Sequence, residues 1–329
     1  MTARKEIELV DVIGDGIVQL RLPMAGNPLG YINGYLVEEN DGYTLIDCGW
    51  KADDVLEALH AGLGLCGLKL GDVRRLLVTH FHFDHYGLAG TLRRAGVPEL
   101  GMHRLDWQFA QRILTDEARA DAESDSWIER NGLSVDTSLE EEIHHRRTEL
   151  TEPTRTLEDG DAVGRLRAVW TPGHSPGHLC FVDTKSGRMF TGDHVLDPIT
   201  PHVGVWHEHR GDPLGDYIAS LEKVDALGAS GVCPAHGEPF PDLHRRVAEL
   251  LAHERKREAH VLDALSGGPV NAAYVASTLP WTRRDRPFSA LSAAHQQFAV
   301  AETLAHLEHL RRAETVTRTD DGFHYALAT

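Results

Sequence analysis

Apolar and polar positions alternate along the first 240 residues in short runs of two kinds. Strand-like runs stand at about 8–22, 32–38, 43–47, 74–79, 165–170, 179–183 and 188–191, each closed by glycine, aspartate or proline. Three other stretches, 54–63, 86–96 and 213–227, place apolar residues three and four positions apart, which predicts helices. Strands that alternate with helices predict a layered α/β body.

Two further regions depart from this pattern. Residues 103–150 are helical and acidic in character without an obvious strand, so we expect a helical insertion there. From about residue 240 the sequence predicts a long helix, a Gly-Gly-Pro break, a short helix, another long helix and a hairpin with an Asp-Asp-Gly turn. This is the order of a winged helix. We therefore predict a catalytic domain over 1–240 and a winged-helix-like domain over 241–329.

Side chains of metal-binding type are concentrated directly after the strand predicted at 74–79. The stretch HFHFDH supplies His80, His82, Asp84 and His85 within six residues. On an extended loop His80 and His82 point to the same side and can hold one metal, whereas Asp84 and His85 can reach a second. Four ligands do not complete two metal sites, so further ligands must come from other strand ends.

Three motifs later in the chain offer those ligands. His174 stands in TPGHSPGH, Asp193 in TGDH and His236 in PAHG, each beside glycine and after an apolar run. HFHFDH and these motifs, in this order, resemble the metallo-β-lactamase-fold hydrolases, the superfamily of glyoxalase II, lactonases and ribonuclease Z. The resemblance covers about residues 7–240. It implies an αββα sandwich with the active site along one edge, where the two sheets meet.

Carried over position by position, the resemblance implies a centre of two divalent metal ions. The expected ligands are His80, His82 and His174 for one ion, Asp84, His85 and His236 for the other, and Asp193 as a bridge. Zinc suits these donors, and iron or manganese could fill the same positions. A hydroxide bridging two such ions exists at neutral pH and would be the nucleophile. Asp84 would orient it, and Asp84 and Asp193 are the expected catalytic residues.

Three nearby residues are expected to support this centre rather than to bind metal. Asp47 ends a predicted strand, at a point where an acidic residue is common in the superfamily, and we expect a structural role. His178, the second histidine of TPGHSPGH, is expected to support a ligand, because ligating imidazoles usually need an orienting partner. Ser175 is interpreted as a loop hydroxyl, since two metal ions make a serine nucleophile unnecessary.

Charge and cysteine content narrow the partners and the compartment. The net charge is −17, and residues 240–329 hold 11 Lys plus Arg against 11 Asp plus Glu, which makes a nucleic-acid partner unlikely because phosphates require cations. The basic cluster at 253–257 is interpreted as a solvated helix face. The cysteines show no CxxC pair, and no run is apolar enough for a leader or a membrane span. We expect a cytoplasmic protein without membrane association.

The favoured activity is hydrolysis of an ester or thioester with a sizeable acyl group, lactones included, on a small-molecule or acyl-carrier-type substrate. Asp193 stands where β-lactamases of this fold have Cys or Ser, and His82 where flavodiiron oxidoreductases have Glu, which disfavours both classes. One alternative is a phosphodiesterase or ribonuclease. Another is a non-catalytic metal-binding protein whose winged helix recruits a partner, although that domain could simply pack on the core or form a homodimer.

The substrate pocket is the least determined feature. Apolar residues in the insertion predict either an ordinary helix–helix core or a lid over an apolar pocket; these are Trp107, Phe109, Ile113, Leu114 and Trp127. The stretch after the expected bridging aspartate, with Trp206, His207 and His209, could form another wall.

Overall fold

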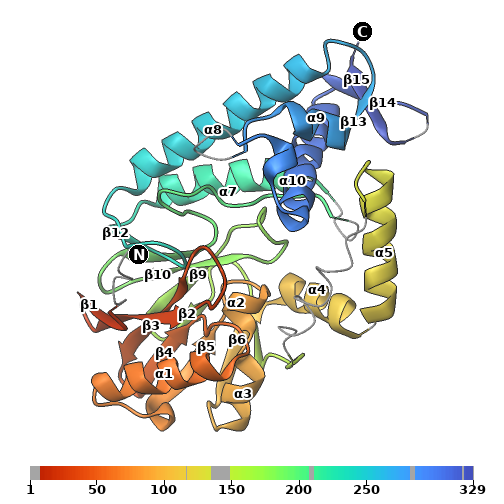
Figure 1. The fold of residues 1–329 in the computed structure, drawn as a ribbon. Helices are drawn as coiled ribbons and strands as arrows, with labels where there is room; N and C mark the ends of the chain where they lie inside the picture. The colour runs from red at the N-terminus through yellow and green to blue at the C-terminus, as the bar shows by residue number, and fades with distance from the viewer. Residues whose placement is uncertain are drawn as a thin grey trace, which may run out of the picture.

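Two β-sheets lie face to face, with helices on both outer sides (Figure 1). A computed structural model describes residues 8–115, 117–134, 149–206, 211–281, 286–320 and 322–328. The first sheet runs in the order β1 (Val10–Gly14), β2 (Ile17–Pro23), β3 (Tyr31–Glu39), β4 (Gly42–Ile46), β5 (Val73–Leu77), β6 (Glu99–His103) and β7 (Arg155–Leu157). The second runs in the order β12 (Gly231–Pro234), β11 (Arg188–Gly192), β10 (Leu179–Asp183), β9 (Leu166–Trp170) and β8 (Ala162–Val163).

Apolar clusters fill the spaces between four layers. Ile17 and Leu77 of the first sheet meet Phe181 and Phe190 of the second in the central space. The outer helices are α1 (Asp53–Leu65) and α3 (Ala89–Arg94) on the first sheet, and α7 (Pro213–Leu227) and α8 (Leu243–Ala264) on the second. Short 3₁₀ turns, η1 (Leu70–Asp72) and η2 (Phe288–Ala290), occur in connections. The layers confirm the predicted αββα sandwich.

Most predicted elements are present, with two revisions. The run at 8–22 is two antiparallel strands, β1 and β2, because the chain turns at Asp15 and Gly16, both with positive φ. The helix predicted at 86–96 is divided into α2 (Phe83–Tyr86) and α3. Gly87 stands at the break, where an added Cβ would lie only 2.4 Å from Cα of Trp50. The prediction missed the short strands β6, β7, β8 and β12.

Parallel pairing directs the strand ends that matter to one edge of the sandwich. Strands β4, β5 and β6 are mutually parallel neighbours, and β11 is parallel to β12, so the carboxyl ends within each set lie together. The two sheets are joined at this edge by hydrogen bonds from Leu179 N to Thr79 O and from Asn33 N to Ala235 O, both 2.8 Å. Loops that follow these strands therefore converge.

The predicted insertion begins with two helices, α4 (Arg104–Thr115) and α5 (Glu117–Arg130), between β6 and β7. Phe109 is buried in the cluster under the first sheet, and Trp107 and Ile113 pack against that cluster. Trp127 is buried among residues of the C-terminal helices. These side chains thus pack in apolar clusters, as the core interpretation expects, and the lid over a pocket stays a prediction. Residues 135–148, the rest of the insertion, lie outside the described residues.

The C-terminal unit has the predicted order of helices followed by a hairpin. After α8 come β13 (Val270–Asn271), α9 (Ala272–Thr278), α10 (Ala293–Arg312), β14 (Val316–Arg318) and β15 (His324–Leu327). The strands form a small sheet in the order β13-β15-β14. Ala305 of α10 packs with α7 and α8 on the second sheet, so this unit rests on the sandwich. The winged-helix assignment and the boundary at 240 stay predictions.

One detail of the C-terminal unit corrects the sequence analysis. Arg257 belongs to the cluster interpreted as a solvated helix face, yet it is only 8% exposed. Its guanidinium pairs with Glu302 at 3.1 Å and lies 4.2 Å from the centre of the Trp281 ring. The basic character of this segment is therefore partly used inside the unit. None of the described helices combines the length and apolar character needed to cross a bilayer.

Candidate metal centre

The predicted ligands stand at the edge where the two sheets meet. They are His80 and His82 after β5, Asp84 and His85 in α2, His174 after β9, Asp193 after β11 and His236 after β12. Segments separated by more than 150 residues thus contribute to one place, because parallel strands end at the same edge. The structure brings all of the predicted site residues together in two adjoining groups.

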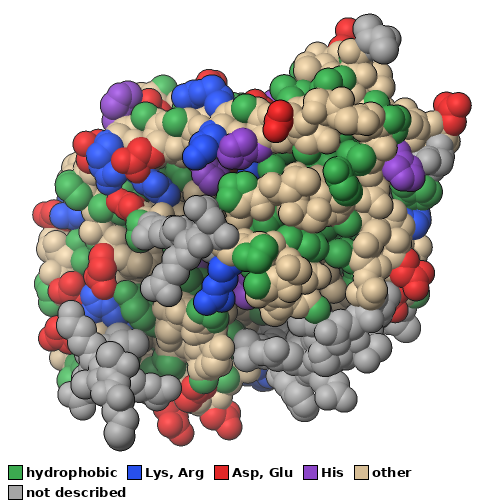
Figure 2. Space-filling model, turned by 45° about the horizontal axis from the view of Figure 1, so that its top comes forward, with side chains coloured by type: hydrophobic (Ala, Val, Ile, Leu, Met, Phe, Trp, Pro, Cys, Tyr) green, Lys and Arg blue, Asp and Glu red, His purple; other side chains and the backbone are tan. Residues whose placement is uncertain are grey.

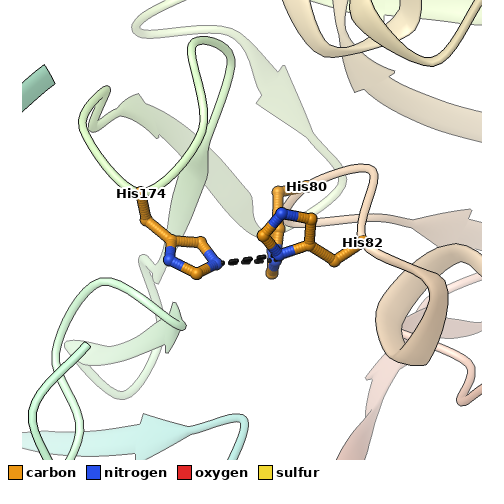
Figure 3. A group of neighbouring side chains, drawn as sticks. All are labelled: His80, His82 and His174. Carbon is orange, nitrogen blue, oxygen red and sulfur yellow. Dashed lines mark hydrogen bonds between the residues drawn. The ribbon is translucent and has the colours of Figure 1, made fainter. Parts of the chain in front are cut away.

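His80, His82 and His174 form the first group, which we call the three-histidine group (Figure 3). His80 Nε2 lies 2.8 Å from His82 Nδ1. His174 Nε2 lies 3.1 Å from the first of these atoms and 3.0 Å from the second. Nitrogen donors of a tetrahedral zinc site stand about 3.3 Å apart, so this triangle is close to what one ion requires.

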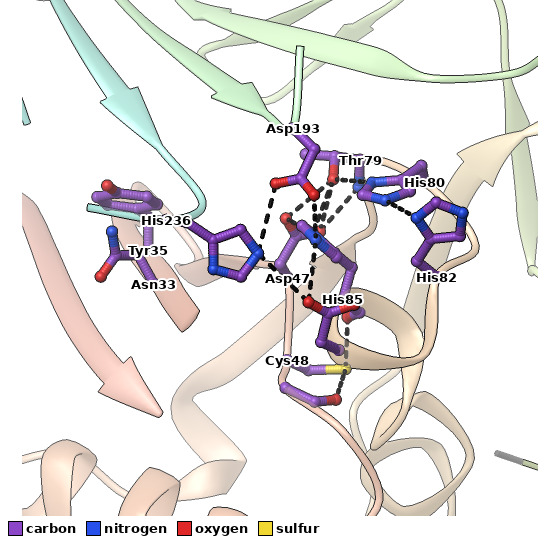
Figure 4. A network of polar contacts seen from close by, with 12 residues as sticks. Asn33, Tyr35, Asp47, Cys48, Thr79, His80, His82, His85, Asp193 and His236 are labelled. Carbon is purple, nitrogen blue, oxygen red and sulfur yellow. Dashed lines mark hydrogen bonds and ion pairs between the residues drawn. The ribbon is translucent and has the colours of Figure 1, made fainter. Parts of the chain in front are cut away.

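Asp84, His85 and His236 form the second group, which we call the mixed group because it joins a carboxylate to two imidazoles. Asp84 Oδ2 lies 3.3 Å from His236 Nε2 and 3.8 Å from His85 Nε2. Figure 4 shows both rings turned toward the space below Asp193. The side chain of Asp84 is 22% exposed and that of His236 only 4%, so the carboxylate is the more open to solvent.

Asp193 lies between the two groups. Its Oδ2 is 3.6 Å from His174 Nε2 in the first group and 3.6 Å from His85 Nε2 in the second. Its backbone N–H donates to Nε2 of His178 at 3.2 Å, so His178 supports this aspartate, in the kind of role expected for it. Gly192 comes just before it with φ +49°, and a Cβ there would lie 2.7 Å from Nε2 of His178. Glycine is therefore required for this close approach.

Hydrogen bonds on the outer side of the rings determine which nitrogen faces the centre. His174 Nδ1 lies 2.7 Å from the carbonyl oxygen of His202. His85 Nδ1 lies 2.8 Å from Asp47 Oδ2. An Nδ1–H that donates outward leaves the lone pair of Nε2 directed inward, as a metal ligand requires.

Asp47 has the structural role expected of it. The carboxylate is 2% exposed and accepts hydrogen bonds from Thr79 N at 2.8 Å and Thr79 Oγ1 at 2.9 Å, in addition to the His85 ring. It thus ties the end of β4 to the start of the HFHFDH loop and to the ring of His85. Thr79 Oγ1 also lies 3.0 Å from His80 Nδ1, so the same network reaches both groups (Figure 4).

Electrostatics differ between the groups. Burial, and after it the neighbouring imidazoles, lowers the pKa of His80 and of His82 well below the ordinary value. Burial alone would also lower the pKa of His85, but the carboxylates of Asp47, Asp84 and Asp193 raise it well above that value. Burial opposes ionisation of Asp84, yet His85 and His236 hold its pKa at about 2. The three-histidine group is therefore neutral, and the mixed group carries opposed charges.

Two buried atoms of the centre have no hydrogen-bond partner among the described residues. They are His85 Nε2 and Asp193 Oδ1. Buried polar atoms are normally paired, so such atoms mark a place for a bound group. Imidazole nitrogen and carboxylate oxygen are donors that zinc prefers and that iron and manganese also accept. The residues present therefore fit divalent metal ions.

Two residues beside the centre were missed in the sequence analysis. Asp106 of α4 is fully buried and accepts hydrogen bonds from Phe81 N, Ser175 Oγ and Gly177 N. Burial raises the pKa of its carboxyl to about 6, against the lowering effect of those donors. His202 contributes a backbone carbonyl, which no sequence pattern reveals. For Asp106 the only available signal was a carboxylate at the start of an otherwise apolar helix face.

Aromatic side chains continue outward from His202. Its ring centre lies 4.9 Å from that of Phe298 and 5.9 Å from that of Trp206, and Trp206 lies 5.1 Å from Trp127. His202 Nε2 donates to the carbonyl oxygen of Phe298 in α10 at 3.1 Å. His174 is thus linked through one residue to the C-terminal unit. His207 and His209, the other candidates for this wall, lie outside the described residues.

Comparisons with known proteins agree with this geometry. Residues 27–236 match the family model described as the metallo-beta-lactamase superfamily. The chain belongs to this superfamily. Its hydrolases include a probable metallo-hydrolase, YqjP of Bacillus subtilis, that is 26% identical over 94% of this chain and 96% of its own. A crystal structure of a metallo-beta-lactamase family protein from Thermus thermophilus aligns with a TM-score of 0.83 and 31% identity, over 96% of this chain and all of that one.

A further relative of the superfamily matches in part. An atrochrysone carboxyl ACP thioesterase of Aspergillus aculeatus, AacuM, is 42% identical over 100 residues, which are 30% of each chain. Superfamily membership and these relatives make the chain a hydrolase with a metal-binding fold. The superfamily identified from four short motifs is therefore confirmed.

Proposed function

We propose that the chain is a metal-dependent hydrolase of esters or thioesters that works with two divalent ions, most simply zinc. The three-histidine group would hold one ion, the mixed group the other, and Asp193 would contact both. The position of Asp193 carries this proposal, since one carboxylate oxygen lies 3.6 Å from a ligand of each group. A single-ion protein would have no need of a second complete donor set.

Bound divalent ions at such a centre supply a hydroxide at neutral pH and polarise the scissile carbonyl. The protein's own part is to orient and to move protons. Asp84 is suited to orienting the attacking water, because its carboxylate is partly exposed and the neighbouring His85 and His236 keep it ionised as a hydrogen-bond acceptor. Its lowered pKa makes it a weak base, so a proton that it takes from the water would be passed on at once to the leaving thiolate or alkoxide. Buried Asp47 and His178 keep His85 and Asp193 in place.

The proposed substrate is an acyl ester or thioester on a small molecule or an acyl carrier. Relatives named as acyl-carrier-protein thioesterases support it. Trp206 and Phe298 support it as well, because their rings contact that of His202, whose carbonyl oxygen lies 2.7 Å from His174 Nδ1, and they offer apolar surface for an acyl group. The surface charge argues against a nucleic-acid substrate, because Lys and Arg are interspersed with acidic side chains on the face in Figure 2.

A substrate panel tests the proposal. Zinc-loaded protein is offered acyl thioesters of increasing chain length, with thiol release followed by a chromogenic disulfide, and single-stranded RNA in parallel. We expect thiol release that depends on the ions and no RNA cleavage. The matched control is the Asp193→Ala protein, which measures any contaminating esterase. RNA cleavage without thiol release would favour a nuclease. Two bound ions per chain without thiol release or RNA cleavage would favour a non-catalytic role.

A further inference from the structure

The Asp106 carboxylate links two loops that are far apart in the sequence. Its Oδ2 accepts from the backbone N–H of Phe81 at 2.9 Å and from Ser175 Oγ at 2.8 Å, and its Oδ1 accepts from Gly177 N at 2.5 Å. Phe81 stands between His80 and His82, and Ser175 follows His174. One side chain therefore holds the backbone on both sides of the three-histidine group.

Burying the Asp106 carboxylate destabilises the fold unless its hydrogen bonds compensate. A carboxylate with no exposed surface loses its hydration, and its hydrogen bonds offset that loss only if all of them are formed. Gly177 shows how closely the parts fit: a Cβ there would lie 2.5 Å from Asp106 N and 2.7 Å from its Oδ1. Small shifts of either loop would break these contacts.

The mixed group is held by a different aspartate. Asp47 accepts from His85 and from Thr79, whereas the hydrogen bonds of Asp106 within the described part of the chain go to Phe81, Ser175 and Gly177. Asp47 thus contacts a ring of the mixed group directly and reaches His80 only through Thr79, whereas Asp106 contacts the two loops that carry the three-histidine group. Asp106 comes from α4, in the segment of the chain inserted between β6 and β7.

We propose that Asp106 is the positioning residue of the three-histidine group, fixing His80, His82 and His174 at the separation that one divalent ion requires. This inference rests on the proposed two-ion centre. Without the carboxylate, the N–H groups of Phe81 and Gly177 lose their acceptor and the two loops are free to separate. The ion of this group is then bound more weakly, and the ion of the mixed group is not.

Zinc titration against a competing chelator tests this on the whole protein. Wild-type protein is expected to bind two zinc ions per chain. Asp106→Ala should weaken one of them by about 10–100-fold, the range found when a group supporting a metal ligand is lost, and leave the other unchanged. Asp106→Asn, which keeps one acceptor, should show the same effect at smaller size. Asp242→Asn, at the start of α8, is the matched control and should bind as wild type.

Double variants, which combine Asp106→Asn with the loss of a candidate ligand, show which of the two ions is weakened. Asp106→Asn should add nothing to His174→Ala, which already lacks that site, but in the His236→Ala background it should weaken the only ion left. Gly177→Ala tests the same contact without changing Asp106, because its Cβ would displace the Asp106 side chain. This variant should give the Asp106→Asn result, and it replaces the Asp106 variants if they do not fold. Unchanged zinc affinity in a folded Asp106 variant, or equal weakening of both ions, would overturn the inference alone. Wild-type protein that binds fewer than two ions would instead overturn the proposed centre.

Discussion

The two halves of the candidate metal centre, the three-histidine group and the mixed group, differ in the electrostatics of their donor atoms. In the three-histidine group, burial keeps the rings of His80 and His82 neutral, so their lone pairs are available without the removal of a proton. In the mixed group, carboxylates raise the pKa of His85, and the imidazoles in turn lower that of Asp84. There the protein's own charges compensate each other in the space where a cation would lie.

This difference indicates which contacts each group needs in order to bind an ion. The three-histidine group has no charge to draw an ion, so it depends on the separation of its nitrogens and hence on the loops that carry them. The mixed group depends on carboxylates, because an ion must replace protons held there. Asp193 belongs to both halves, and its loss should be the most severe.

The largest effect is expected for Asp193→Ala. Removing a carboxylate that reaches both groups should weaken both ions and lower kcat/KM by more than about 100-fold, because even groups that only support a ligand cost 10–100-fold. Metal content by elemental analysis and thioester turnover measure the two effects. Full turnover at unchanged metal content in this variant would refute the ligand assignment.

The next comparison sets His174→Ala against His236→Ala. Each should leave one ion bound per chain, since each removes an imidazole from a different group. Turnover should be lost in both, because the proposed chemistry uses both ions. Zinc stoichiometry at saturation is the measurement. If either variant loses both ions together, the halves are not independent and the division into two groups is wrong.

A smaller and one-sided effect is expected for Asp47→Asn. The amide can still accept from Thr79 N, but it no longer provides the negative charge that raises the pKa of His85. The ion of the mixed group should be bound about 10–100-fold more weakly, and the other ion should be weakened less, because Asp47 reaches His80 only through Thr79. Competitive zinc titration measures both affinities, and the Asp106→Asn protein should show the opposite order of effects. Equal or greater weakening of the three-histidine group in the Asp47 variant would contradict the assignment.

The grouping of the candidate ligands could be predicted because their signal is local. His80, His82, Asp84 and His85 are consecutive or nearly so, and His174 follows a readable strand. Strand ends in parallel arrangement meet, so strand assignment alone places such residues together. The layered α/β body followed from the alternation of apolar runs, and the αββα sandwich followed from the resemblance that the four motifs carry. Short strands such as β7 and β8, of three and two residues, are below the length at which alternation can be recognised.

The supporting contacts could not be predicted, because they depend on three-dimensional packing. Asp106 lies on a helix whose sequence resembles any amphipathic helix, and its partners are backbone N–H groups 25 and 71 residues away. The contribution of His202 is a carbonyl oxygen, which every residue has. Arg257 was misread for a related reason, since an arginine on a helix looks solvated until a neighbouring helix supplies Glu302 and Trp281.

The smallest expected effect concerns the substrate rather than the ions. Phe298 is 46% exposed on α10, and its ring contacts those of His202 and Trp206 beside the three-histidine group. If an acyl chain lies on this surface, Phe298→Ala should raise KM for long-chain thioesters by about 3–10-fold, roughly the value of one lost aromatic contact, and leave short-chain substrates and both ions unchanged. Steady-state kinetics across the chain-length series measures this.

Tyr274 is the matched control for that variant. It is an aromatic residue of the same C-terminal unit, 53% exposed on α9, and no aromatic ring contact joins it to His202 within the described part of the chain. Tyr274→Ala should therefore leave KM unchanged at every chain length. An equal rise in KM for both variants would indicate a general disturbance of the C-terminal unit. A rise in KM for short and long chains alike in the Phe298 variant would show that this residue affects the centre through His202 and not through the acyl group.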